Sequence, residues 1–134
     1  MKKFFSVNYS SSAFNITMLL LRLGAGSLLM SHGYDKLIHF SETKAKFINF
    51  LGIGSATSLT LVIFAEVFCA MLVIIGLFSR LVVIPIIFSL SVALFKVHHL
   101  NVFTDGEKAA LFLTCFIPIL LCGPGKISVD GMMR

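Results

Sequence analysis

Long apolar segments set the strongest constraint on how this chain can fold. Four of them, at residues 13–34, 57–77, 81–99 and 107–123, carry no more than two charged side chains each. A helix needs roughly 20 such residues to cross the hydrocarbon core of a bilayer, and 134 residues leave room for four crossings with short connections. We therefore predict an all-α integral membrane protein, a four-helix bundle that forms a single domain over residues 1–134.

Composition excludes the main alternatives to a membrane protein. Hydrophobic residues make up 57% of the chain, charged residues only 13%, and the mean hydropathy is +0.99, so a water-soluble fold could not cover its surface with polar groups. The net charge is +5, but the cations are scattered between apolar runs. This pattern favours contact with lipid headgroups, and we expect no nucleic-acid partner.

The connections between the spans also carry a pattern. Residues 41–54 alternate apolar and Lys positions at helical spacing, which predicts a short interfacial helix between spans one and two. An even number of spans places both termini on the same side of the membrane. The distribution of Lys and Arg leads us to expect that this is the cytoplasmic side.

Two charged residues inside the spans require either an ion-pair partner or a functional role, because placing a charge at the bilayer centre costs about 3 kcal/mol of insertion free energy. Arg22 lies about 18 Å from the predicted end of span one, and Glu66 lies about 14 Å from the adjoining end of span two. These similar depths predict an Arg22–Glu66 ion pair. The pair could fix helix packing, or it could line a ligand or proton site, and both interpretations stay open.

A second set of titratable residues is expected at one mouth of the bundle, because spans one and three run in the same direction. His side chains there could move protons or donate to a quinone carbonyl, while Glu107 could pair with Lys96. The alternative is that each is a solvated interfacial side chain. With the pair above, the candidates for a ligand or proton site are Arg22, His32, Lys36, Glu66, Lys96, His98, His99 and Glu107.

We predict no metal site and assign no catalytic residue. Haem ligation by His32 with His98 or His99 would require axial ligands at one depth on facing helices, and we do not favour it. The ligand spacing of a zinc site is absent. The three cysteines lie inside apolar segments without a CxxC motif, so we interpret them as small buried hydrophobic residues.

Several motifs in order along the chain resemble one known family. Span one reads LLLRLGAGSLLMSHGYDKL, span two contains Glu66, and GLFSRL, ALFKVHH, GEKAALFL and GPGKISVD follow at residues 76–81, 93–99, 106–113 and 123–130. Together these resemble the DoxX family of small bacterial membrane proteins over nearly the whole chain. The resemblance implies a multi-pass four-helix bundle in the bacterial cytoplasmic (inner) membrane.

The resemblance also implies a function and a set of residues. Related proteins include the DoxD-type subunit of an archaeal thiosulfate:quinone oxidoreductase, which implies redox work with quinone as the cofactor. Most of the candidates above match positions in the recurring motifs, and the resemblance adds Arg80 and Lys126 at the opposite face. We expect these two cations to anchor helix ends and to contact lipid phosphates.

Three functions therefore stay open at the level of sequence. The chain could be a quinone-linked oxidoreductase subunit whose electrons come from a partner. It could instead be a non-catalytic membrane anchor that stabilises a soluble oxidoreductase subunit. A small-molecule carrier or channel is the third alternative, and four short spans would then require a homo-oligomer.

Overall fold

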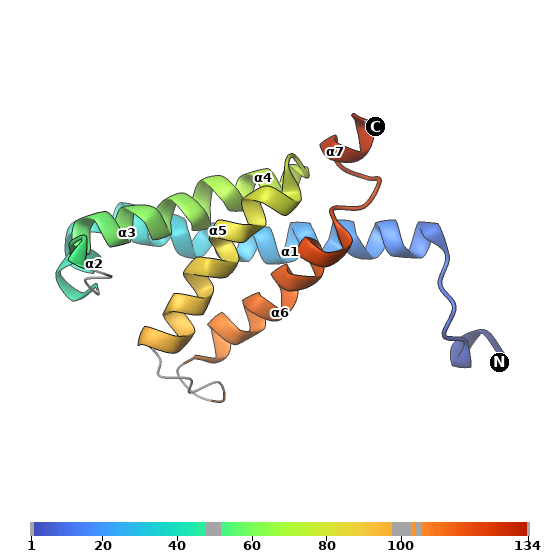
Figure 1. Cartoon of the computed structure of the whole chain (residues 1–134), viewed down its shortest axis with the longest axis horizontal. Coiled ribbons are helices and arrows are strands. Elements are labelled where there is room, and N and C mark those ends of the chain that lie inside the picture. Colours follow the sequence, from blue (N-terminus) through green and yellow to red (C-terminus); the bar gives the residue numbers. More distant parts are fainter. Residues whose placement is uncertain (1, 48–51, 98–102, 104–105, 134) are drawn as a thin grey trace.

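The computed structural model describes residues 2–47, 52–97, 103 and 106–133, and within these ranges the regular structure is entirely helical (Figure 1). This confirms the all-α prediction. The helices, with π-helical segments written η3 and η4, are η1 (Lys2–Phe5), α1 (Ser11–Ile38), α2 (Phe40–Lys46), α3 (Ser55–Ile63), η3 (Phe64–Cys69), α4 (Ala70–Ile75), α5 (Ser79–Val92), η4 (Ala93–Val97), α6 (Glu107–Cys122) and α7 (Val129–Met132).

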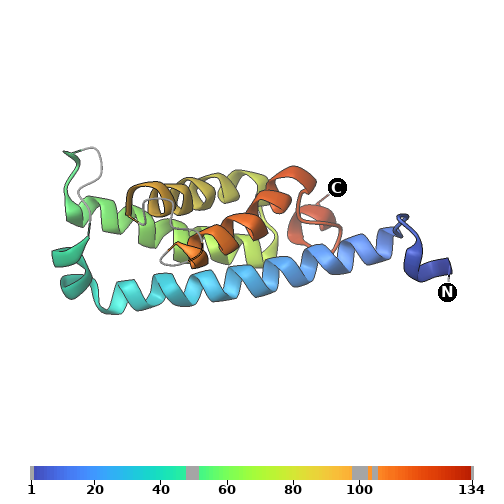
Figure 2. The ribbon, with the colours of Figure 1, turned by 90° about the horizontal axis from the view of Figure 1, so that it is seen from below.

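Three helical stretches are long and apolar enough to cross a membrane. They are Ser11–Ile38, Ser55–Ile75 and Ser79–Lys96, of 28, 21 and 18 residues. The α6 helix has 16 residues, about 24 Å of rise against a hydrocarbon core of about 30 Å, so the fourth crossing stays a prediction. Figures 1 and 2 show both termini at the end of the molecule where α1 begins and α6 ends.

The α1 helix is longer than the apolar run that predicts it. It continues past residue 34 to Ile38, and at its end the C-cap residue His39 places Nδ1 3.3 Å from Asp35 Oδ1, an i,i+4 contact that helices favour. Hydropathy marks where lipid contact ends, whereas a helix continues for as long as its backbone hydrogen bonds do. The predicted span boundary at residue 34 is therefore four residues short of the helix end.

Glycines bring α1 close to the second long helix. A Cβ added at Gly26 would lie 2.7 Å from Ile74 Cγ1, and one added at Gly33 would lie 2.7 Å from Glu66 Cβ. Small residues at such crossings let two backbones approach closely within a membrane. The resulting core contains Met18, Ala25, Leu29, Cys69, Ala70, Val73, Val82, Val83, Ile86, Leu90, Phe116 and Ile119.

A short helix follows α1, as the sequence predicts. The α2 helix covers Phe40–Lys46 and buries none of its residues, so it matches the first half of the predicted segment at residues 41–54. Residues 48–51 lie outside the described ranges. A position of α2 in the membrane interface stays a prediction.

Candidate functional site

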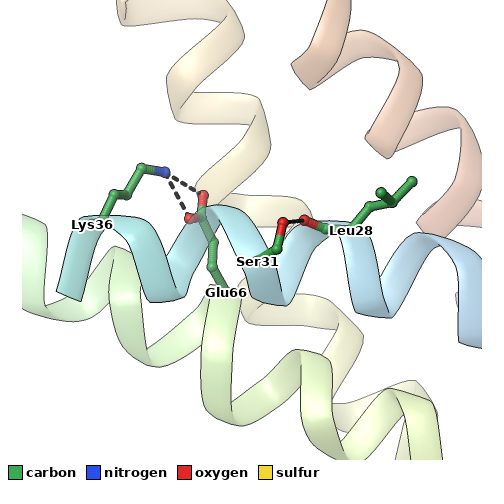
Figure 3. A network of polar contacts seen from close by, with 4 residues as sticks. All are labelled: Leu28, Ser31, Lys36 and Glu66. Carbon is green, nitrogen blue, oxygen red and sulfur yellow. Dashed lines mark hydrogen bonds and ion pairs between the residues drawn. The ribbon is translucent and has the colours of Figure 1, made fainter. Parts of the chain in front are cut away.

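Glu66 and Lys36 form an ion pair inside the bundle (Figure 3). The Lys36 Nζ donates to both carboxylate oxygens of Glu66, at 2.8 Å to Oε1 and 2.6 Å to Oε2. The Glu66 side chain is 7% exposed and the Lys36 side chain 29%. The carboxylate is thus enclosed by the bundle, and the ammonium covers it from the more open side.

The local backbone explains why these two side chains meet. Gly33 is in close contact with Glu66, and Lys36 lies three residues further along α1, which places both on one face of that helix. Glu66 belongs to the π-helical segment η3. Such segments insert an extra residue into a helix and frequently occur at functional sites.

The predicted Arg22–Glu66 pair is wrong. Within the described part of the chain, the guanidinium of Arg22 donates only to backbone carbonyls, and the Glu66 carboxylate accepts from Lys36. Glu66 lies beside Gly33, which is about 16 Å along α1 from Arg22. The depth comparison counted from residue 34 and so left out the last four residues of α1, about 6 Å of helix, which accounts for part of this offset.

Arg22 instead joins three parts of the chain. It is 1% exposed, and its guanidinium donates to Val73 O (2.9 Å), Ile74 O (2.8 Å), Pro124 O (3.0 Å) and Ile127 O (2.7 Å). The last carbonyls of a helix have no intrahelical donor, and Arg22 supplies one at the end of α4. It thereby fastens the segment after α6 to α1 and α4.

Asp130 secures the same region and is a residue that the site prediction missed. Its Oδ1 accepts from Phe78 N at 2.8 Å and its Oδ2 from Ser79 N at 3.0 Å, so it caps the first turn of α5. Its own N–H donates to Gly76 O at 2.9 Å. Asp130 is the last residue of the GPGKISVD motif, which was therefore the available signal.

The other candidates at the bundle mouth that the structure describes do not join the ion pair. His32 is exposed, and its ring meets Phe112 of α6 edge-on at 5.8 Å between centroids. Lys96 and Glu107 are exposed, and within the described residues no ion pair joins them. His98 and His99 lie outside the described residues.

Arg80 and Lys126 lie at the other end of the bundle, where both line an open groove of about 660 Å³. Arg80 is exposed, and its Nη2 donates to Leu121 O at 3.4 Å. Lys126 is exposed, and its backbone N–H donates to Asn15 Oδ1 at 2.9 Å. In the ranges that the structure describes, no three His, Cys, Asp or Glu side chains come together as metal ligands would.

Three helical stretches long and apolar enough to cross a bilayer define the class: this is an all-α integral membrane protein. A family model described as DoxX matches residues 17–99. Since this match covers more than half of the chain, the protein belongs to the DoxX family, and the resemblance in its motifs is confirmed. No curated protein and no solved structure matches the chain.

Proposed function

We propose that this DoxX-family protein is a quinone-linked subunit of a membrane oxidoreductase, in which Lys36 and Glu66 handle the protons of the quinone. The Lys36–Glu66 pair is the observation that supports the proposal. A carboxylate and an ammonium held 2.6 Å apart between apolar helices are costly to place in a membrane, and ionisable residues at such depth often mark proton or ligand pathways.

The proposed chemistry follows from what the quinone needs. Reduction of a quinone to a quinol takes up two electrons and two protons. A partner subunit with its own redox group would supply the electrons. Glu66 would give up or accept a proton at its carboxylate, and Lys36, at 29% exposure, would connect the carboxylate with the headgroup region.

The proposal also places the chain in the bacterial cytoplasmic membrane with both termini in the cytoplasm. Reporter fusions at each terminus test this placement, with alkaline phosphatase active only outside the cytoplasm and a fluorescent protein fluorescent only inside it. Alkaline phosphatase activity at either terminus would contradict the orientation.

The decisive measurement is the amount of quinone bound per chain. The protein should be purified from its own membranes in mild detergent, and its quinone content per chain should be measured by extraction and mass spectrometry. We expect near-stoichiometric quinone in the wild type and a loss of at least about ten-fold in Lys36→Met and Glu66→Gln, the size expected when a buried charge loses its partner. Lys108→Met is the matched control, since Lys108 is an exposed cation of α6.

Other results would favour the other functions. A quinone-free wild type that copurifies with a soluble oxidoreductase would point to a non-catalytic anchor. Ligand-dependent flux through liposomes that contain the purified chain would point to a carrier or channel. In either case the quinone proposal would fail.

A further inference from the structure

The open groove near the two termini combines polar and apolar walls. It lies between the start of α1, the turn from α4 to α5, and the segment that follows α6. Phe14, Phe78 and Leu81 form its apolar side, and Phe78 and Leu81 are 56% and 66% exposed. Its volume of about 660 Å³ is within the range of small-molecule sites. Such walls fit a ligand that is itself amphiphilic.

The charge balance of the groove favours an anion. Arg80 and Lys126 both line it and are both exposed. Asp130 also lines it, but both of its carboxylate oxygens already accept backbone N–H groups at the start of α5. Among the described residues, neither cation takes part in an ion pair.

A buried hydroxyl in the groove wall lacks a partner. The Ser79 side chain is 0% exposed, and within the described part of the chain its Oγ is the one buried side-chain oxygen without a hydrogen bond. Ser79 is next to Arg80 and lines the groove. The Ser79 hydroxyl therefore has a hydrogen bond left to donate to an acceptor in the groove.

We propose that the groove binds the phosphate of one anionic phospholipid, with Arg80 and Lys126 as the cationic ligands and Ser79 as an additional hydroxyl donor. The groove lies where the membrane-crossing helices Ser11–Ile38 and Ser79–Lys96 begin and Ser55–Ile75 ends, which is the level of the lipid headgroups. Phe78 and Leu81 then contact the first carbons of the acyl chains. This site is separate from the Lys36–Glu66 pair and does not depend on the quinone proposal.

Native mass spectrometry of the whole chain tests the site. The protein is equilibrated with equal amounts of palmitoyl-oleoyl phosphatidylglycerol and phosphatidylcholine in detergent, and the retained lipids are counted. We expect one phosphatidylglycerol to be retained selectively. Removing one phosphate-binding cation should reduce the selectivity about five-fold, so Arg80→Gln/Lys126→Gln should reduce it about 25-fold.

The control has the same charge change at the opposite end of the bundle. Lys44→Gln/Lys108→Gln removes two exposed cations on α2 and α6 and should retain the wild-type selectivity. If the Arg80→Gln/Lys126→Gln variant does not fold, Lys126→Gln alone is tested, because the Lys126 side chain makes no hydrogen bond or ion pair with the described residues. Ser79→Ala should lower the selectivity by about five-fold through one lost hydrogen bond.

Three results would overturn parts of the proposal. Unchanged selectivity in the Arg80 and Lys126 variants, or an equal loss in the control, would show that the groove does not select the lipid. Displacement of phosphatidylglycerol by millimolar inorganic phosphate or glycerol phosphate would assign the site to a soluble phosphate instead. Wild-type selectivity in Ser79→Ala would remove Ser79 from the site.

Discussion

Replacing Arg22 by Met should destabilise the protein by about 3–5 kcal/mol. The substitution keeps an unbranched apolar stem but removes four hydrogen bonds of 2.7–3.0 Å from a side chain that is 1% exposed. Hydrogen bonds to a charged group contribute about 1.5–3 kcal/mol each, a gross loss of about 6–12 kcal/mol. Removing the guanidinium also removes several kcal/mol of its own burial cost, which leaves the smaller net value.

Unfolding in a series of SDS–detergent mixtures, followed by far-UV circular dichroism, measures this free energy. Limited trypsin digestion adds a local readout, because the carbonyls of Pro124 and Ile127 lose their donor. Cleavage after Lys126 should therefore accelerate more than cleavage after Lys108. Arg22→Lys should recover only part of the stability, since one ammonium cannot reach carbonyls on both α4 and the C-terminal segment.

Double-mutant cycles distinguish this network from an Arg22–Glu66 pair. The effects of Arg22→Met and Glu66→Leu should add to within about 0.5 kcal/mol, because the two sites are about 16 Å apart along α1. Lys36→Met and Glu66→Leu should instead show a coupling of about 1 kcal/mol or more, since their charged atoms lie 2.6 Å apart. A stable Arg22→Met/Glu66→Leu double variant, with each single variant unfolded, would refute the reasoning.

Three further predictions concern packing, capping and thiol chemistry. Gly33→Ala should cost about 1–3 kcal/mol in SDS unfolding, because its Cβ would press on the backbone of Glu66. A Cβ added at the control position Gly24 would meet no described atom within 4 Å outside its own helical turn, so Gly24→Ala should be neutral or slightly stabilising; equal losses in both would contradict the close crossing. Asp130→Ala should cost about 0.5–2 kcal/mol by uncapping α5, and an unchanged unfolding midpoint would argue against the cap. All three cysteines are free, but only Cys69 is buried as expected, whereas Cys115 is half-buried and Cys122 exposed. Replacing all three by Ala should leave the quinone content unchanged, whereas its loss would indicate thiol chemistry.

The pattern of the sequence was enough to predict the class, the approximate helices and the family. Apolar runs give the helix positions because a bilayer requires continuous helical hydrogen bonding wherever lipid surrounds the chain. The motifs gave the DoxX family, which the match to residues 17–99 confirms. The charged residues Arg22 and Glu66 stood out as buried groups in need of partners, and both are buried in the structure.

The sequence could not predict the π-helical segments η3 and η4. Apolar residues such as Phe64 and Ala93 are equally compatible with an α-helix and a π-helix. The hydrophobic pattern therefore does not indicate where a turn contains an extra residue. The exposure of His32 was also open, because it depends on which face of α1 meets α6.

What the sequence by itself determined is that Arg22 and Glu66 must each be satisfied inside an apolar bundle, because the cost of an unpaired charge there depends only on residue type and depth. Which partner each one takes was decided by the tertiary structure. The close crossing at Gly33 fixes the register of α1 against η3 and brings Lys36 to Glu66, whereas the C-terminal segment, more than 100 residues away along the chain, folds back to Arg22. The register of α1 against η3 and the return of the C-terminal segment to Arg22 both arise from packing between segments that are distant along the chain. No local pattern of residues encodes such packing.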